Sequence, residues 1–264
     1  MKVLELIDFD LKLSLKNQAD LVIGVDEVGR GSLAGSVVCA AYSFNPDVRI
    51  INYSENLLKL DDSKKIKNKD RMSLVNILKN AIPASLYAIQ ENSVQYINSY
   101  GIMKAIFTAM ARAVSEIIIN FREQTELDSI RVLILVDGPK PIPDLDLYLK
   151  TDENLKIRVP QESIKIKQIA IKKGDGLSAS IAAASNIAKD YRDRLMKELI
   201  LKDTKLKPYS WDTNVGYGSL KHRKAILEHG LTRHHRISFC QNLKLPPLIS
   251  PNSQNHPPEL KLET

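Results

Sequence analysis

The sequence predicts an α/β protein, because short apolar runs alternate along the chain with longer segments of helical periodicity. The run LVIGVDEV at residues 21–28 is short, apolar and rich in β-branched residues, as buried strands are. The clearest helix, expected over about residues 101–121, has apolar side chains at helical spacing: Ile102, Ile106, Met110, Ala113 and Ile117. The 264 residues suffice for one large domain or a domain with an appendage.

The other expected elements follow from the same two periodicities. Further strands are expected over residues 36–44, 85–90, 131–136 and 166–173, and the first two strands are close enough to form a hairpin. Further helices are expected over about residues 69–79 and 223–228, and from near Ser178 onward. The last of these has a face of small residues that would allow close packing on a sheet: Ala179, Ala182, Ala183 and Ala188. Residues 139–155 are rich in proline and are expected to form a loop.

Composition changes after Lys202, where tyrosine and tryptophan alternate with basic residues. We therefore predict a core over residues 1–202, an appendage with a short helix over 203–244 and a disordered, proline-rich tail over 245–264.

The charge of the chain is consistent with a polyanionic partner. The 38 Lys and Arg residues exceed the 31 Asp and Glu residues, giving a net charge of +7. Anionic membrane surfaces would attract the same charge, but no apolar run approaches the ~20 residues that span a bilayer. Acidic residues at Glu5, Asp8 and Asp10 interrupt the apolar run that a signal peptide needs. We expect a soluble cytoplasmic protein that does not bind membranes.

Four carboxylates stand at the ends of predicted strands. Asp26 and Glu27 lie in the first strand, Asp137 ends a later one, and Asp175 lies between glycines before a helix. Burying a carboxylate within an apolar strand is costly unless its charge is compensated. Mg²⁺ or Mn²⁺ would compensate the negative charge of several carboxylates together. Composition alone, however, favours a metal site no more than it favours unrelated acidic residues at the ends of strands. Adjacent strand residues point to opposite faces, so either the strand is irregular or one of Asp26 and Glu27 reaches the metal from the rim.

Six ordered sequence blocks carry a resemblance to a known family. They are IGVDEVGRGSLAGSVVCAA, DDSKK, LVDG, KKGDG with the following SIAAASNIAKDYRDRLM, GYGSLKH and HGLTRHHRISF. Together they span residues 22–239 in collinear order, and this part of the chain resembles ribonuclease HII. The resemblance implies an RNase H-like mixed sheet flanked by helices, with a small helical C-terminal extension. It also implies an endonuclease that cuts the RNA strand of RNA–DNA hybrids and ribonucleotides embedded in DNA, acting as a monomer.

The resemblance assigns catalytic and metal-binding roles to Asp26, Glu27, Asp137 and Asp175. Two Mn²⁺ or Mg²⁺ ions about 4 Å apart would activate water on one side of the scissile phosphate and stabilise the leaving oxygen on the other. The products would carry 5′-phosphate and 3′-hydroxyl ends. Asp193 is the rival for the fourth position, but Arg192 and Arg194 flank it on an expected exposed helix face. A helix-capping role is the alternative for Asp175.

Substrate contacts are also implied by the resemblance. The Gly29-Arg30-Gly31 turn and Tyr217 would sense the 2′-hydroxyl at the RNA–DNA junction, whereas GRG alone indicates only a turn. The further substrate-binding candidates are lysines placed to contact phosphates: Lys64, Lys65 and Lys221.

The chain departs from the family pattern at three positions. Ser32 and Ser36 replace common prolines, and Gly101 replaces a common asparagine. None of these changes removes a carboxylate, so rate or precision is in question more than activity.

Four other interpretations remain. Ribonuclease HIII has the same core, but only 25 residues precede Asp26, too few for its additional domain. Another two-metal nuclease would share the acids without GRG and GYG, and an inactive nucleic-acid-binding protein would not need all four carboxylates. A zinc site with His234, His235 and Cys240 matches no standard spacing.

Overall fold

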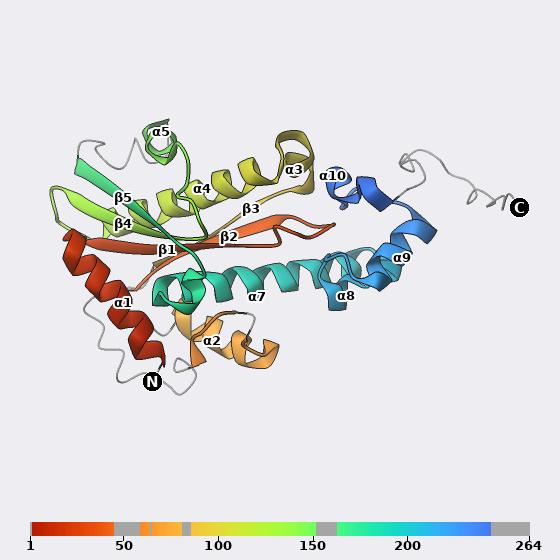
Figure 1. The fold of residues 1–264 in the computed structure, drawn as a ribbon, viewed down its shortest axis with the longest axis horizontal. Helices are drawn as coiled ribbons and strands as arrows, with labels where there is room; N and C mark the ends of the chain where they lie inside the picture. Colours follow the sequence, from red (N-terminus) through yellow and green to blue (C-terminus); the bar gives the residue numbers. More distant parts are fainter. Residues whose placement is uncertain (1, 45–58, 64, 81–85, 152–162, 244–264) are drawn as a thin grey trace, which may run out of the picture.

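Five strands form one mixed sheet in the computed structural model, in the order β3-β2-β1-β4-β5 (Figure 1). The structure describes residues 2–44, 59–63, 65–80, 86–151 and 163–243. The central strand β1 pairs antiparallel with β2 and parallel with β4, and the outer pairs repeat these directions. The strand bounds are β1 Leu21–Val28, β2 Val37–Ser43, β3 Leu86–Asn92, β4 Ile130–Asp137 and β5 Ile164–Ile171. The predicted α/β class and mixed sheet are confirmed.

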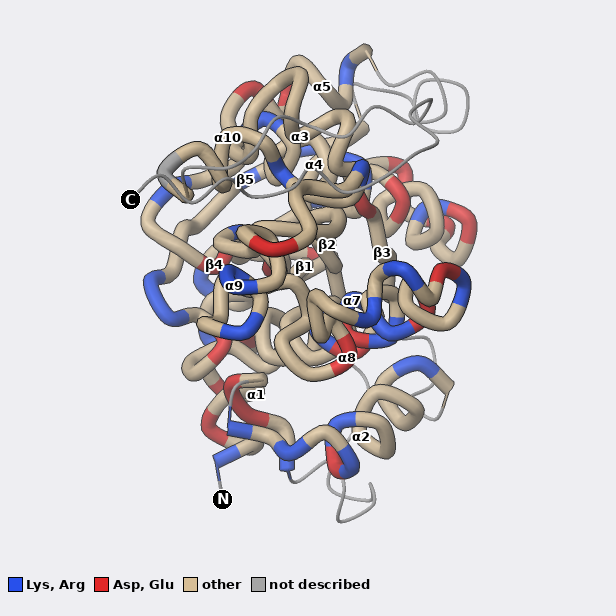
Figure 2. The backbone as a smooth tube through the Cα atoms, turned by 90° about the vertical axis from the view of Figure 1, so that its right-hand side faces the viewer, with Lys and Arg blue, Asp and Glu red and all other residues tan. Residues whose placement is uncertain are grey.

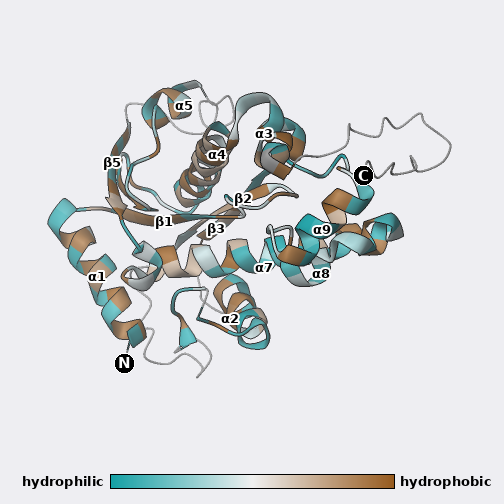
Figure 3. Cartoon of the chain, turned by 45° about the vertical axis from the view of Figure 1, so that its right-hand side comes forward, coloured by the Kyte–Doolittle hydropathy of each residue, from teal (hydrophilic) through white to brown (hydrophobic). Residues whose placement is uncertain are grey.

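Helices cover both faces of the sheet (Figure 1). The long helix α4 (Ile102–Glu123) packs on one face in a cluster that includes Ile23 and Ile134. The opposite face carries α7 (Ala179–Lys202), α2 (Asn68–Asn80) and α1 (Lys2–Asn17). Two buried faces explain why β1 and β2 are hydrophobic along most of their length, as Figure 3 shows.

Helix α7 lies directly against the central strand at Gly24. A Cβ atom there would stand 2.2 Å from the backbone carbon of Ser180 and 2.3 Å from the backbone nitrogen of Ile181. Any larger residue at Gly24 would push the helix away. The small-residue face of α7 is buried against the sheet as predicted, at Ala179, Ala182, Ala183 and Ala188. This contact fixes the position of α7 relative to the end of β1.

The structure corrects several predicted elements. The prediction of a loop over residues 139–155 was wrong in part, because α5 (Leu145–Thr151) lies within it and buries Leu145 and Leu149. The sequence patterns also missed α1 and α3 (Val94–Tyr100). The first strand has its predicted bounds, β1 and β2 are antiparallel as a hairpin requires, and the other predicted elements shift by a few residues.

The segment after α7 packs on the helix that precedes it. Its elements are η5 (Thr204–Tyr209), α8 (Trp211–Asn214), α9 (Leu220–His229), α10 (Ile237–Cys240) and η6 (Gln241–Leu243). Trp211 and Ile226 of this segment share an apolar cluster with Met196 of α7 and with Leu33, which follows β1. The extension is therefore attached to the same end of β1 that carries Asp26. The predicted tail over residues 245–264 lies outside the described residues.

Lys and Arg positions, blue in the backbone trace of Figure 2, lie along α9, which faces the viewer. They include Lys221, Arg223 and Lys224. None of the helices in the described part of the chain combines the length and apolarity needed to cross a membrane.

Candidate active site

Asp26 and Asp137 lie side by side on neighbouring strands. The parallel pairing of β1 and β4 places Val25 opposite Val136, so the two aspartates are the next residues on each strand. Alternate residues of a strand point to the same face of the sheet. Asp26 therefore shares a face with Val28, which packs toward α7. Asp137 shares a face with Leu135, which packs on Ile181 of α7. The two carboxylates therefore share the α7 face at the centre of the sheet.

Asp26 lies in a buried and negatively charged environment. Its side chain is buried, at 5% exposure. Burial raises the pKa of Asp26 well above its ordinary value, and the negative charges of Glu27 and Asp137 raise it further, while a hydrogen bond from Ser185 lowers it. Among the described residues, no Lys, Arg or His forms an ion pair with Asp26. The site concentrates negative charge where it is costly.

Glu27 projects from the opposite face of β1. It stands opposite Cys39, whose thiol packs beneath α4, and the antiparallel pairing continues regularly to Val28. The Glu27 side chain is 16% exposed, and its Oε1 lies 3.8 Å from Arg30 Nη1. The strand is therefore regular, which leaves only an approach from the rim for Glu27.

A tight turn closes over the end of β4. The backbone N–H of Gly174 donates to Asp137 Oδ1 at 2.6 Å, and a Cβ atom at Gly174 would lie 2.6 Å from Ile181 Cδ1. Asp175 follows in the buried turn η4 (Gly174–Gly176). The N-cap of α7 is Ser178, whose Oγ accepts the N–H of Ile181 at 3.2 Å. The capping alternative for Asp175 is weakened because another residue performs that role.

Asp193 has structural partners, although not the predicted ones. Its carboxylate pairs with Lys189 at 2.6 Å and Arg71 at 3.6 Å. The expected exposed face flanked by arginine partners was wrong, because Arg192 is fully buried and Asp193 itself is 13% exposed. Helix α7 is covered by α2 at this point, and α2 supplies Arg71.

The acidic residues fit a divalent cation by their chemistry. Carboxylate oxygens are preferred ligands of Mg²⁺ and Mn²⁺, and a cation beside Asp26 would offset both its burial and the repulsion from Asp137. In the described part of the chain, no three His, Cys, Asp or Glu side chains converge closely enough to form a ready metal cage.

The Gly29-Arg30-Gly31 turn and Tyr217 are brought together from distant parts of the chain. Gly216 accepts hydrogen bonds from the N–H groups of Leu33 and Ala34, at 2.8 and 3.2 Å. The ring of Tyr217 is 38% exposed, and its centroid lies 5.6 Å from the guanidinium carbon of Arg192. The exposed face of this tyrosine therefore opens beside the turn that follows β1.

Two of the lysine candidates lie around these residues. Lys65 is exposed, 3.6 Å from Asp61, in the segment whose Ser63 Oγ lies 3.0 Å from Ser185, a hydrogen-bond partner of Asp26. Lys221 is exposed near the start of α9, four residues after Tyr217. Lys64 lies outside the described residues.

The structure shows the surroundings of the three positions that depart from the family pattern. Ser32 is fully buried, and its hydroxyl has no partner among the described residues, whereas Ser36 Oγ donates to Glu91 at 3.1 Å. Gly101 has φ 81° and ψ 159°, a conformation that is essentially restricted to glycine. An asparagine at position 101 would require a different junction between α3 and α4.

Two buried histidines in the extension are neutral. The N–H of Trp211 donates to His222 Nε2 at 3.0 Å, while His222 Nδ1 faces the carbonyl of Tyr217 at 2.9 Å and must carry the proton. His235 Nδ1 accepts the N–H of Thr232 at 2.9 Å, which leaves its Nε2–H directed at His222, 3.2 Å away. Burial lowers the pKa of His222, and burial with the nearby His222 lowers that of His235 to about 3.

We expect acid to loosen the extension. Both histidines have folded-state pKa values below their ordinary 6.5, so their contribution to stability is complete above pH 6.5. It falls as the pH drops toward 3, by at most about 1.4 kcal/mol per pH unit and group. Trp211, the single tryptophan, reports this locally, and its fluorescence should change as the pH falls from 6.5 toward 3. If the fluorescence change of a His222→Gln variant had the same pH midpoint as the wild type, its assignment to the buried histidines would be wrong. His229→Gln is the control at an exposed histidine.

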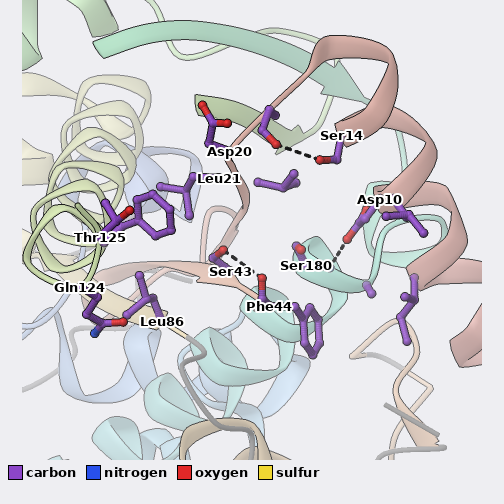
Figure 4. A pocket seen from close by; sticks show the side chains of 16 residues that line it. Asp10, Ser14, Asp20, Leu21, Ser43, Phe44, Leu86, Gln124, Thr125 and Ser180 are labelled. Atoms are coloured by element: carbon purple, nitrogen blue, oxygen red, sulfur yellow. Dashed lines mark hydrogen bonds between the residues drawn. The ribbon is translucent and has the colours of Figure 1, made fainter. Parts of the chain in front are cut away.

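A cavity of ≈ 380 Å³ lies at the other end of the sheet (Figure 4). Leu21 and Val22, the first residues of β1, line it, so it is separate from the strand end that carries Asp26. Asp10 points into it from α1, and its Oδ2 accepts the N–H of Ser180 at 2.8 Å. Burial raises the pKa of Asp10 to about 6. This carboxylate caps the start of α7 and has no connection to the carboxylates described above.

Sequence patterns missed two residues that organise the site. Arg192 and Arg236 are fully buried, and each hydrogen-bonds several backbone carbonyls of the loop after β1. The RDR and HHR segments contain them, but basic residues in such runs ordinarily lie in solvent. The one indication in the sequence was that both arginines lie within segments that match the family pattern.

The fold and the carboxylates at the ends of adjacent strands define a nuclease of the RNase H-like class. A family model described as Ribonuclease HII matches residues 23–242. A ribonuclease HII of Wolbachia pipientis from Culex pipiens is 37% identical over 233 residues, covering 88% of this chain and 95% of that protein. The chain belongs to the ribonuclease HII family, whose members are endonucleases that act on the RNA of RNA–DNA hybrids, and it is a hydrolytic ribonuclease.

Solved structures support the fold. The ribonuclease H2 of Pyrococcus horikoshii aligns with TM-score 0.60 at 19% identity, covering 85% of this chain and 97% of that one. Bst-RNase HIII, whose structure is a complex with Mn²⁺, aligns with TM-score 0.53 at 20% identity, covering 80% of this chain and 63% of that one.

Proposed function

We propose that the protein cuts the RNA strand of RNA–DNA hybrids and also ribonucleotides embedded in DNA, leaving 5′-phosphate and 3′-hydroxyl ends. Two divalent ions, Mg²⁺ or Mn²⁺, would be held by Asp26, Glu27, Asp137 and Asp175. The observation that supports this most is the pair of Asp26 and Asp137 at the ends of adjacent central strands, where Asp26 is buried and has no ion-pair partner among the described residues. The Mn²⁺ complex of the structurally similar ribonuclease HIII is consistent with it.

The residues of the chain would have separate roles in this reaction. Bound ions supply an activated water and stabilise the leaving oxygen. Asp26 and Asp137 hold the negative charge that binds the ions, and the N–H of Gly174 orients Asp137 through its hydrogen bond. Glu27 contributes from the rim, and Asp175 from the turn over β4. In this arrangement the carboxylates at the ends of β1 and β4 would hold the ions, and the loop after β1 would contact the substrate.

Ribose recognition is assigned to the turn and to Tyr217. Gly29 is required by the chain itself, because a Cβ atom there would lie 2.1 Å from Arg192 Nε. Gly31 is exposed, and a Cβ atom there would meet nothing within 4 Å. A ligand that approaches this backbone would account for the missing side chain. Lys64, Lys65 and Lys221 would contact phosphates, which position the duplex without reading the sugar.

The proposal is tested with an end-labelled DNA duplex that contains one ribonucleotide, alongside a continuous RNA–DNA hybrid. We expect cleavage of both with Mg²⁺ or Mn²⁺, none with chelator, and 3′-hydroxyl ends that a polymerase can extend. Cleavage without divalent ions, or 3′-phosphate ends, would overturn the two-metal mechanism.

Gly31→Ala tests the turn directly. An added methyl group would obstruct the sugar, so we expect about 10-fold slower cleavage at the single ribonucleotide with little change in the melting temperature. Ser32→Ala is the neighbouring control, because it removes a buried hydroxyl that has no described partner. Equal rates for the two variants would remove the turn from ribose recognition.

A further inference from the structure

We propose that Arg192 and Arg236 are positioning residues that lock the Gly29–Gly31 turn and the Tyr217 loop into one ribose-reading unit. This inference rests on the proposed function, in which both segments contact the ribose. It assigns specificity to two buried side chains that cannot themselves reach a substrate.

Arg236 fixes the turn from the extension. Its Nη1 donates to the carbonyls of Gly29 and Arg30, at 2.7 and 3.1 Å. Its Nε and Nη2 donate to Gly35 and Ser36, at 2.9 and 3.1 Å. One guanidinium therefore holds the carbonyls on both sides of the loop that begins with the turn. The N–H of Arg236 also donates to Leu33 at 2.7 Å.

Arg192 joins the same loop to the Tyr217 segment from α7. Its three donor nitrogens reach the carbonyls of Ser36 at 3.1 Å, Val215 at 2.8 Å and Ala34 at 3.0 Å. Its guanidinium packs against Gly29 and stacks on the ring of Tyr217. A displacement of Arg192 would therefore move both proposed ribose contacts together.

The backbone connects the two segments as well. Gly35 donates to the carbonyl of His234 at 2.9 Å, and Ala34 forms a β-bridge with His235. The neutral His222 holds the carbonyl of Tyr217 from the other side at 2.9 Å. The two arginines thus sit at the joint between the core and the extension, which lie side by side at the end of α7 (Figure 1).

Stability is a weak reason for two arginines to be buried here. Both are fully buried, and no described Asp or Glu forms an ion pair with either. Burial lowers the pKa of both groups, and the charge of Arg192 lowers that of Arg236 further. Burying a cation is costly even when carbonyls solvate it. The planar guanidinium is suited to holding several carbonyls in fixed directions, which the single ammonium of lysine cannot do.

The test uses Arg236→Lys and Arg192→Lys, which keep the positive charge but lose the planar guanidinium and its several donors. The exposed controls are Arg233→Lys and Arg194→Lys, each two or three residues from its target. Cleavage rates are measured on the single-ribonucleotide duplex and on the continuous hybrid. A continuous hybrid offers a 2′-hydroxyl at every register, so we expect the target variants to lose on the order of 10- to 100-fold more rate on the single ribonucleotide. Equal losses on the two substrates would indicate a merely structural role and overturn the inference.

Hydrogen exchange supplies a readout that does not depend on activity. In the wild-type protein the amides of Leu33 and Ala34 should be protected, and in the lysine variants the peptides covering residues 29–36 and 215–217 should exchange faster. Fast exchange of these amides in the wild type would overturn the lock even if a variant failed to fold.

The same experiments separate this inference from the proposed function. If Gly31→Ala and Tyr217→Ala change the ratio of the two rates while both arginine variants leave it intact, the lock is wrong and the proposed function stands. If none of the four changes the ratio, ribose reading by this surface is wrong. The exchange data then decide whether the arginines still order the loop.

Discussion

Replacing Asp26 with asparagine is expected to abolish cleavage while leaving duplex binding nearly intact. Asparagine keeps the shape of the side chain and removes the charge that would bind the ions. A bound metal ion supplies several kcal/mol of transition-state stabilisation, so the rate should fall by at least about 10³-fold. Duplex affinity comes mainly from phosphate contacts elsewhere. Asp137→Asn should behave in the same way, and near-normal turnover of either variant would contradict the metal assignment.

The same variant should gain stability in the absence of divalent ions. Burial and the charges of Glu27 and Asp137 raise the pKa of Asp26, so the carboxylate destabilises the folded state at neutral pH. Asparagine removes that repulsion. We expect Asp26→Asn to melt higher than the wild type in chelator, and Mn²⁺ to raise the melting temperature of the wild type only.

Asp193→Asn is the matched control, because it also replaces an acid near the site. It breaks ion pairs with Arg71 and Lys189, so we expect a lower melting temperature and retained cleavage. Loss of cleavage at unchanged stability would instead make Asp193 a functional residue.

The sequence predicted those parts of the fold in which periodicity reflects burial. Strand β1 and helix α4 are buried on well-defined faces, and both were found within two residues of their bounds. Helix α5 was missed because proline residues precede its seven residues, and turn signals dominate so short a segment. Helix α1 was missed because Asp10 interrupts its apolar face, and that aspartate is buried to cap α7, which only the tertiary structure reveals.

The candidate site was predictable in part. The alternation of a strand places Asp26 and Glu27 on opposite faces, and the structure shows this arrangement. The approach of Asp26 to Asp137 depends on the pairing of β1 with β4, which no local pattern specifies. Arg236 contacts Gly29, 207 positions away in the chain, and its buried charge is satisfied by carbonyls rather than by an acidic side chain. A backbone carbonyl can accept a hydrogen bond whatever its side chain, so no sequence pattern marks the partners of such a buried arginine.

Tyr217→Ala is expected to weaken cleavage at a single ribonucleotide more than it weakens duplex binding. The ring is partly exposed beside the turn, and Arg192 stacks on it. A stacking contact contributes on the order of 1–3 kcal/mol, which corresponds to about a 10- to 100-fold rate loss if it acts mainly in the transition state. Tyr217→Phe is the conservative control and should retain most of the rate.

Lys221→Ala should produce the opposite pattern, although the residue lies only four positions from Tyr217. Its exposed ammonium would contact a phosphate, which carries no information about the sugar. We expect weaker binding to every duplex alike. The slope of log affinity against log salt concentration should fall by about one. Both variants are compared on the single-ribonucleotide duplex and the continuous hybrid across a salt series. If Tyr217→Ala matches Lys221→Ala on both substrates, Tyr217 belongs to the general binding surface, and its assignment to the RNA–DNA junction is wrong.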